Sequence, residues 1–208
     1  MAAISIYGVP PSTFTRAVLM GCREKGIEYE LVPTFPSTVG PLNPFGKIPA
    51  MTHGDVTLFE SSAILRYLDN AFPGPKLWPA DARAAAIVDQ WVGAACDSLL
   101  NSAQRYMAAR FNFLPVPAEM TRKYLDKSRE VLPAFDRQLG KTRYVAGDML
   151  TAADLVAAPP FFYFPEIPEL KDILDSQPNC RRWMDEIAAR PSFAATVTPP
   201  EMKPKLAN

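Results

Sequence analysis

The chain has 208 residues and a formal net charge of zero at pH 7, because 22 lysines and arginines balance 22 aspartates and glutamates. This balance disfavours nucleic acid and anionic membranes as partners, and a small-molecule ligand is the better expectation. The three cysteines, Cys22, Cys96 and Cys180, lack the spacing of a disulfide framework or a zinc site. With neither a basic leader nor an apolar run of about 18 residues, the sequence predicts a cytoplasmic protein without a metal or a membrane segment.

The first 72 residues alternate between strand-like runs and helical periods. The strand-like runs are residues 4–9, 27–33, 48–52 and 56–60. Helical periods at 13–26 and 61–72 follow the first and the last of these runs. A βαβ unit followed by a hairpin predicts a mixed four-stranded sheet covered by helices, with His53 on the surface beside the hairpin turn.

The remainder of the chain is predicted to be helical. Residues 73–82 are proline-rich and aperiodic, which is typical of a linker. Over residues 83–106 apolar side chains recur every four residues and predict one long helix with a buried stripe made of Ile87, Trp91, Ala95, Leu99 and Ala103. The predicted organisation is an α/β domain at 1–76, a linker and helix start at 77–86, and an all-helical domain at 87–208.

The stretch GDMLTAADL contains a helix-start signal. Thr151 at the N-cap and Asp154 three residues later form a carboxylate variant of the capping box, and Leu150 can pack on Leu155 as a hydrophobic staple. Such a cap stabilises a helix by about 1 kcal/mol. Because the cap accounts for every residue of the motif, a catalytic role for Asp154 is the weaker interpretation.

The stretch GVPPSTFTRAVL joins the first predicted strand to the first predicted helix. Ser12 stands where an N-cap hydroxyl accepts a hydrogen bond from the first turn of a helix. A chemical role for this hydroxyl is the alternative, and Thr13 and Thr15 offer neighbouring hydroxyls.

Four motifs occur in order along the chain: PPST around Ser12, NPFGKIPA, LFESSAI and TAADL. Together they resemble the cytosolic glutathione S-transferases, and most of all the serine-type phi, tau and theta classes, over nearly the whole chain. The resemblance implies a thioredoxin-like N-terminal domain that binds glutathione as co-substrate, and an all-helical domain that shapes a pocket for a small hydrophobic electrophile. It also implies a homodimer, in which Phe45 of the NPFG motif inserts into the partner subunit.

The resemblance assigns binding roles to five residues. Pro49 would be cis, which costs little at proline, and the backbone of Ile48 before it would pair with the cysteinyl backbone of glutathione. Lys47 would reach the glycyl end. Glu60 would pair with the α-ammonium group, and Ser61 would hold the γ-glutamyl carboxylate at a helix N-terminus. The alternatives are a proline that opens an edge strand, a serine that only caps a helix, and a solvated lysine.

By the same resemblance, Ser12 acts on the thiol of glutathione. A free thiol with a pKa near 8.5 is about a few per cent ionised at neutral pH. A hydroxyl that donates to the sulfur would lower this pKa by about one to two units, without help from a histidine. Thr13 and Thr15 remain alternatives for this role.

Two further features concern the substrates. The aromatic residues Tyr106, Phe111, Phe113 and Phe162 could line the electrophile pocket, although aromatic side chains more often belong to the core. Residues 34–42 lack the basic side chains that many relatives use to hold the glycyl carboxylate, so glutathione could bind weakly. The predicted activity is conjugation of glutathione. A glutathione-dependent peroxidase, reductase or isomerase, or a non-catalytic interaction module of the same fold, is the alternative.

Overall fold

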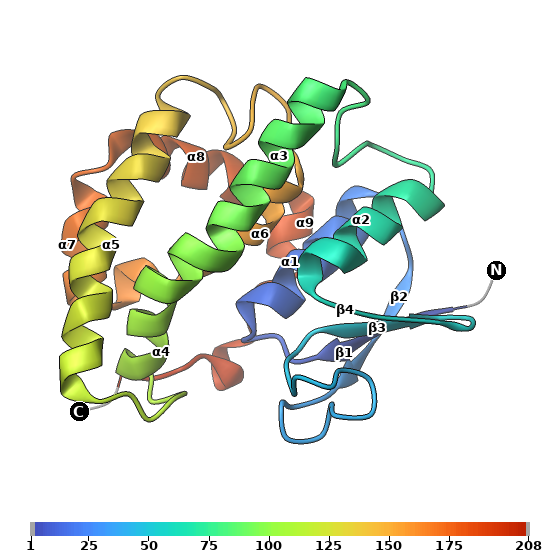
Figure 1. Ribbon diagram of the computed structural model, residues 1–208, viewed down its shortest axis with the longest axis horizontal. Coiled ribbons are helices and arrows are strands. Elements are labelled where there is room, and N and C mark those ends of the chain that lie inside the picture. The colour runs from blue at the N-terminus through green and yellow to red at the C-terminus, as the bar shows by residue number, and fades with distance from the viewer. Residues whose placement is uncertain (1–2, 207–208) are drawn as a thin grey trace.

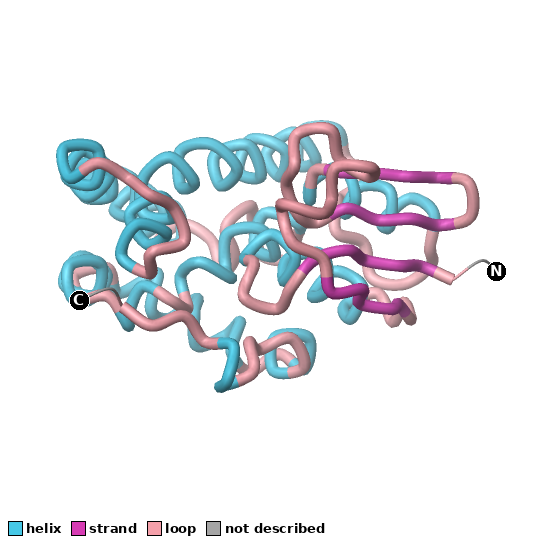
Figure 2. The backbone as a smooth tube through the Cα atoms, turned by 90° about the horizontal axis from the view of Figure 1, so that it is seen from below, coloured by secondary structure: helices cyan, strands magenta, loops and turns pink. Residues whose placement is uncertain are grey.

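The computed structural model describes residues 3–206. Its strands are β1 (Ile4–Gly8), β2 (Tyr29–Pro33), β3 (Ala50–His53) and β4 (Val56–Phe59). They form one sheet in the order β2-β1-β3-β4, in which β1 and β2 are parallel and the other two pairs are antiparallel (Figures 1 and 2). The predicted mixed four-stranded sheet is therefore confirmed.

Helices α1 (Thr13–Glu24) and α2 (Ser61–Ala71) pack against this sheet and against each other. Close approach of the two helices depends on Gly21, where an added Cβ would lie 2.3 Å from the side chain of Leu65. The other face of α1 packs against α6 (Ala152–Phe161) of the helical domain. Helix α1 is thus the element through which the thioredoxin-like and all-helical domains share their core.

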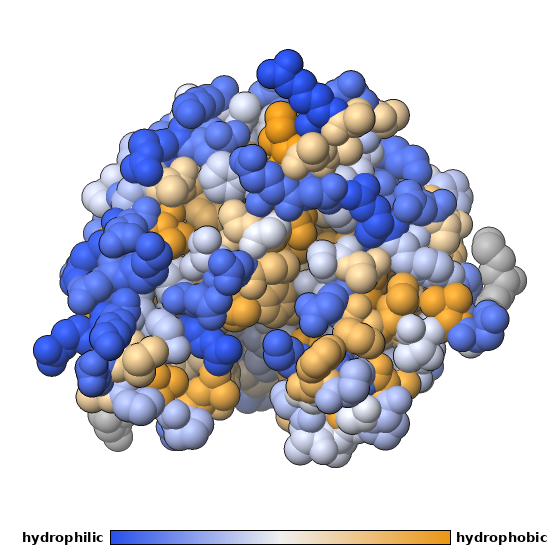
Figure 3. All heavy atoms as spheres, viewed as in Figure 1, coloured by the Kyte–Doolittle hydropathy of each residue, from blue (hydrophilic) through white to orange (hydrophobic). Residues whose placement is uncertain are grey.

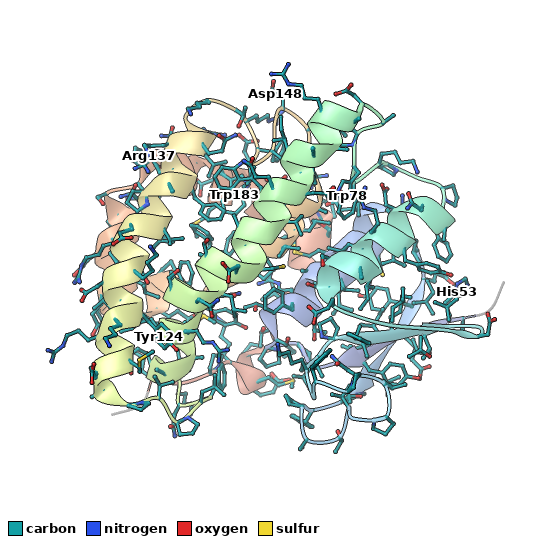
Figure 4. All side chains as sticks on the ribbon, viewed as in Figure 1. His53, Trp78, Tyr124, Arg137, Asp148 and Trp183 are labelled. Atoms are coloured by element: carbon teal, nitrogen blue, oxygen red, sulfur yellow. The ribbon has the colours of Figure 1, made fainter. Side chains whose placement is uncertain are left out.

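The helical domain surrounds a core of aromatic side chains. Its other helices are α3 (Ala82–Ala94), η1 (Ala95–Gln104), α4 (Arg105–Arg110), α5 (Ala118–Leu139), α7 (Pro168–Asp175), α8 (Pro178–Ala188) and α9 (Pro191–Ala194), with short 3-10 turns η2 (Phe164–Glu166) and η3 (Pro200–Met202). Trp183 and Phe161 are fully buried with ring centres 5.2 Å apart, and Figure 4 shows Trp183 among the helices. The predicted capping box of Thr151 and Asp154 is present at the start of α6.

The prediction of one uninterrupted helix over 83–106 is wrong. The segment consists of α3, the π-helix η1 and α4, and Asn101 inside η1 has a non-helical ψ of 17°. The predicted stripe also fails at its start, because Ile87 is 37% exposed while Val88 and Val92 are buried. Strict four-residue spacing drifts by about 40° at each step of an α-helix, so a long stripe of this kind cannot stay on one face.

The predicted linker is held firmly by a buried carboxylate. Asp69 of α2 accepts hydrogen bonds from the backbone N–H groups of Leu77 (2.9 Å) and Trp78 (3.2 Å), and it pairs at 3.1 Å with Lys25, the C-cap residue of α1. Leu77 and Trp78 are themselves buried. A proline-rich and aperiodic sequence therefore forms an ordered connection here, because a distant side chain satisfies its backbone donors.

The expected surface position of His53 is only partly correct. Its Nδ1 atom lies 2.7 Å from the hydroxyl of Tyr67, and its ring is 5.2 Å from that of Phe72. Figure 4 places His53 at the end of the β3–β4 hairpin. His53 is half-buried because α2 lies beneath the hairpin, a contact that the local sequence does not reveal.

Helix α1 is also tied to the C-terminal helices by an ion pair. Glu24 accepts hydrogen bonds from Arg190 at 2.7 and 2.6 Å and from the hydroxyl of Ser192. Burial raises the pKa of the Glu24 carboxyl, but the hydrogen bonds from Arg190 and Ser192 outweigh it, and the pKa is lowered overall. The charged form of Glu24 therefore stabilises the fold.

Replacing Glu24 with glutamine should lower the free energy of unfolding by about 1–2 kcal/mol at pH 7. Because the pKa of Glu24 is lower in the folded chain, its contribution is complete above the unfolded value of about 4.3 and is lost as pH falls through the folded value. Urea unfolding at several pH values should thus show the difference shrinking below about pH 4. Glu130→Gln, which removes an exposed pair with Lys127, is the control and should cost less than about 0.5 kcal/mol.

No helix within residues 3–206 combines the length and the apolar composition that crossing a bilayer requires. Over the same residues, His, Cys, Asp and Glu side chains form no group of three that could hold a metal ion.

Candidate active site

Ser12 lies at the carboxyl end of β1, immediately before α1. Its hydroxyl oxygen accepts a hydrogen bond from the backbone N–H of Thr15 at 3.2 Å, so the predicted N-cap is present. The side chain is partly exposed. Because capping uses a lone pair of the oxygen, the O–H proton of Ser12 remains available to a ligand.

The two neighbouring hydroxyls are placed differently. Thr15 is fully buried, and its hydroxyl faces Gly8, where an added Cβ would lie 2.3 Å away. The hydroxyl of Thr13 accepts a hydrogen bond from Gln104 of η1 at 3.1 Å. Ser12 is therefore the hydroxyl of this segment that is both accessible and without an interdomain partner in the described part of the chain.

A buried asparagine shapes the loop before β3. Asn43 is 1% exposed; it donates to the carbonyl of Lys47 at 2.7 Å and accepts from the N–H of Phe45 at 3.0 Å. The loop leads into the Ile48–Pro49 peptide bond, which is cis as the resemblance implied. The sequence analysis missed Asn43, although an asparagine before Pro-Phe-Gly is typical of a side chain that organises a turn.

The start of α2 has an unusual backbone. Glu60 occupies the N-cap position with a φ of 67°, a conformation that costs a residue other than glycine about 1–3 kcal/mol and is concentrated at functional sites. No side chain caps this helix, which excludes the interpretation of Ser61 as a capping residue only. The N–H groups of the first turn are therefore available to an anion.

A cleft of about 120 Å³ brings five of the predicted residues together. It is lined by Lys47, Ile48, Pro49, Glu60 and Ser61, and also by Phe14, Cys96 and Leu100. Figure 3 shows the hollow between the two halves of the molecule, with apolar side chains in its walls. Residues from both domains thus contribute to one cleft, and Phe14 places it beside the first turn of α1.

The sequence analysis did not associate three wall residues of the cleft, Phe14, Cys96 and Leu100, with binding, and Cys96 is the one that carries a thiol. Burial, and secondarily the charge of Glu60, raise the pKa of its thiol to about 11. The thiol is therefore protonated at neutral pH and is a poor nucleophile.

The four predicted pocket aromatics do not line this cleft. Tyr106 and Phe111 are buried, Phe113 is 50% exposed, and the ring centre of Phe162 lies 4.0 Å from that of Phe193. Tyr163, in the same aromatic run as Phe162, has its ring centre 6.0 Å from that of Phe111 and directs its hydroxyl toward the carbonyl of Pro11 at 3.5 Å. A role for the four residues in electrophile binding stays a prediction.

A larger cavity, of about 590 Å³, lies at the opposite end of the sheet. Lys25, Tyr29 and Phe72 are among its wall residues, and none of the predicted site residues lines it. Although this cavity is larger than the cleft at Pro49 and Ser61, we do not assign the active site to it, because none of the predicted site residues lies in its wall.

The fold and the cleft define a class of protein. A thioredoxin-like domain supplies a cis-proline loop and a helix N-terminus. The all-helical domain contributes further wall residues to the same cleft. Backbone groups beside a cis-proline and an uncapped helix suit an extended peptide with a carboxylate at one end.

Comparison with known proteins places the chain in a family. Residues 6–76 match the model of the glutathione S-transferase N-terminal domain, and residues 100–191 match that of the C-terminal domain. Glutathione S-transferase F13 of Arabidopsis thaliana is 32% identical over 92% of this chain and 93% of its own length. Glutathione S-transferase 3 of Zea mays is also 32% identical, over 95% of this chain and 94% of its own. The chain belongs to the glutathione S-transferase family.

Solved structures agree with this assignment. The crystal structure of poplar glutathione transferase F1 has a TM-score of 0.85 and 30% identity, and the match covers 94% of this chain and 97% of that one. The structure of a glutathione S-transferase-I bound with lactoylglutathione has a TM-score of 0.81 and 26% identity, and covers 94% and 98%. The thioredoxin-like and all-helical architecture is thus the architecture of these transferases.

Proposed function

We propose that this protein transfers the glutathione thiolate to small hydrophobic electrophiles. The observation that carries the proposal is the cleft that is lined by the cis-proline loop, by the uncapped start of α2 and by Phe14 in the first turn of α1, the helix that Ser12 caps. The relative solved with lactoylglutathione supports a ligand of the glutathione type.

Each end of glutathione has a matching group in this arrangement. The γ-glutamyl carboxylate would bind the N–H groups at the start of α2 and the hydroxyl of Ser61, while Glu60 would pair with the α-ammonium group. The backbone of Ile48 would pair with the cysteinyl residue, and Lys47 would reach the glycyl carboxylate. The sulfur would then be directed toward Ser12, whose O–H stabilises the thiolate.

The cysteines disfavour a thiol-based reductase. A reductase of this fold would use a cysteine in place of Ser12, and Cys22 is fully buried with its pKa raised by burial to about 12. Cys96 reaches the cleft but carries a protonated thiol at neutral pH. Cys22, Cys96 and Cys180 are all unpaired, which supports a reducing compartment such as the cytoplasm.

A non-catalytic module remains the second candidate, because residues 34–42 contain no basic side chain for the glycyl carboxylate. The two candidates differ in a direct measurement. Calorimetric titration with glutathione should show binding, and thiol-conjugation assays with chlorinated aromatic substrates should show turnover. Absence of binding at about millimolar glutathione would favour the module.

Replacing Glu60 with glutamine should weaken glutathione binding by about 1.5–3 kcal/mol, because the charge-assisted bond to the α-ammonium group is lost. Calorimetry on the folded variant measures this change. Glu30→Gln on β2, an exposed carboxylate outside the cleft, is the matched control and should leave affinity unchanged. Equal affinities of the two variants would show that the γ-glutamyl group lies elsewhere.

We expect the protein to form a homodimer that depends on Phe45. This side chain is 66% exposed on the loop organised by Asn43, and an exposed loop aromatic that fills a partner's pocket is an effective anchor. Phe45→Ser should shift the mass measured by light scattering toward the monomer, whereas Phe35→Ser, which changes an aromatic that is 56% exposed on the same connection, should not. A native protein that is already monomeric would contradict the expectation.

A further inference from the structure

A separate cavity of about 140 Å³ lies behind Tyr163. The first half of α1, the end of α6 and the segment after α9 enclose it, and its principal wall residues are Arg16, Phe162, Tyr163, Phe193, Val197 and Lys203. Figure 1 shows the C-terminal segment, in red, running from α9 past the start of α1. The cavity shares no wall residue with the cleft at Pro49 and Ser61.

Arg16 is the unusual residue of this cavity. It is 4% exposed, its nearest polar partners are the carbonyl of Phe193 at 3.3 Å and the hydroxyl of Thr196 at 3.5 Å, and its guanidinium stacks 3.9 Å from the ring centre of Phe193. Within residues 3–206 no carboxylate lies within 4.0 Å of it. Burial lowers its pKa to about 10, a change that the nearby Tyr163 opposes, so Arg16 is charged at neutral pH. A buried cation without a counter-ion is costly.

The contacts of Arg16 leave one side of its guanidinium open. Its Nε and Nη2 atoms have protein partners, whereas Nη1 has none among residues 3–206, and Arg16 forms part of the cavity wall. The edge of a planar guanidinium is a better geometric match for a carboxylate than it is for a point anion. The unused donor therefore favours a carboxylate ligand.

The other wall residues restrict that ligand further. Lys203 adds a second cation at the rim, and the single acidic wall residue, Glu166, already pairs with it at 3.3 Å. Two cations against one carboxylate favour a ligand with one negative charge. Phe162 and Val197 present apolar surface, and the volume of about 140 Å³ favours a small ligand.

From these contacts we infer that the cavity binds a small aryl or alkyl monocarboxylate, with the carboxylate on Arg16 and the apolar body against Phe162 and Val197. The site is separate from the proposed glutathione cleft, so both ligands bind at the same time. Its wall residues Tyr163 and Thr198 contact the carbonyls of Pro11 and Pro10 at 3.5 and 3.1 Å, in the segment that leads to Ser12.

Calorimetric titration of the full chain with benzoate tests the site, and benzamide is the neutral control of the same shape. Benzoate should bind, and benzamide should bind at least about tenfold more weakly, the effect of losing a charge-assisted bond. Arg16→Met should weaken benzoate binding by at least about tenfold, and Lys203→Met by about two- to fivefold. Lys205→Met, which removes an exposed lysine two residues further on and outside the cavity wall, should leave binding unchanged.

Because Arg16→Met also removes contacts that hold the C-terminal segment, a second variant leaves Arg16 in place. Val197 is 47% exposed at the cavity, and Val197→Trp should fill the space and abolish benzoate binding. Saturating glutathione should leave the benzoate affinity unchanged. Equal binding of benzoate and benzamide, no binding up to about 20 mM, normal binding to Val197→Trp, or displacement by glutathione would each overturn the inference.

Discussion

Ser12→Ala should move the pH midpoint of glutathione conjugation upward by about one to two units and should lower the rate at pH 7 by about tenfold or more. The physical reason is the loss of a hydroxyl donor that stabilises the thiolate relative to the thiol. Most of the proposed glutathione contacts lie at the cis-proline loop and at α2, so affinity should change by no more than several-fold. Absorbance of the thiolate in the binary complex, titrated against pH, measures the shift directly.

The capping role of Ser12 requires a control, because its hydroxyl oxygen also accepts the N–H of Thr15 at 3.2 Å. Loss of this cap alone should cost about 0.5–2 kcal/mol of stability. Asp81 caps α3 in the same manner, accepting the N–H of Ala84 at 2.8 Å, and lies outside the cleft. Asp81→Ala should therefore reproduce the loss of stability without moving the pH profile.

The alternatives to Ser12 give different results. A normal pH profile in the folded Ser12→Ala variant would leave Ser12 as a helix cap only. Thr13→Val then becomes the deciding variant, because Thr15 is fully buried against Gly8 and cannot contact a ligand without rearrangement of β1 and α1. An upward shift in Thr13→Val but not in Ser12→Ala would transfer the role to Thr13.

Asp154→Ala should destabilise the protein by about 3–5 kcal/mol, the largest loss of stability that we expect from a single change. Asp154 is fully buried and accepts hydrogen bonds from the N–H of Val145 (2.9 Å), the N–H of Thr151 (2.9 Å) and the indole N–H of Trp183 (3.0 Å). The hydroxyl of Thr151 also donates to Asp154 at 3.2 Å, so removing the carboxylate leaves four buried donors without this acceptor. Unfolding in urea, followed by tryptophan fluorescence, measures the effect.

Two variants keep this prediction testable if Asp154→Ala fails to fold. Asp154→Asn should destabilise the protein less than Asp154→Ala, because the amide oxygen still accepts hydrogen bonds. Some loss should remain, because the amide nitrogen places a donor against another donor. Asp148→Ala, in the same connection, removes an exposed side chain that accepts one backbone hydrogen bond from Arg143 at 3.2 Å, and Figure 4 shows Asp148 on the outer rim of the domain. A similar loss in Asp148→Ala and Asp154→Ala would contradict the proposed role of the buried carboxylate.

Several features of the site could be read from the sequence because they depend on neighbouring residues. The caps at Ser12 and Thr151 involve partners three residues away, and the strands and the hairpin follow from alternation and a two-residue turn. The resemblance added the cis-proline at Pro49, whose isomer local sequence does not determine. For the caps, the strands and the hairpin, the signal and the structure lie within a few residues of each other.

Other features depended on contacts between distant parts of the chain. The ordered connection after α2 depends on Asp69, the burial of His53 depends on Tyr67 and Phe72, and the accessible hydroxyl is Ser12 because Gly8 and Gln104 engage its neighbours. None of these contacts leaves a periodic signal in the sequence.

The sequence by itself thus determined most element types and the order of the two domains, because periodicity, turn chemistry and caps act over short separations, and the family resemblance pointed to five of the residues that line the cleft. Only the tertiary structure decided where the long helix changes to a π-helix, that Glu60 has a positive φ, and that Arg16 is buried without a carboxylate. Backbone distortion and burial of a charge depend on the packing of segments such as α1 and 191–203, which lie far apart in the chain, and local sequence patterns contain no information about those contacts.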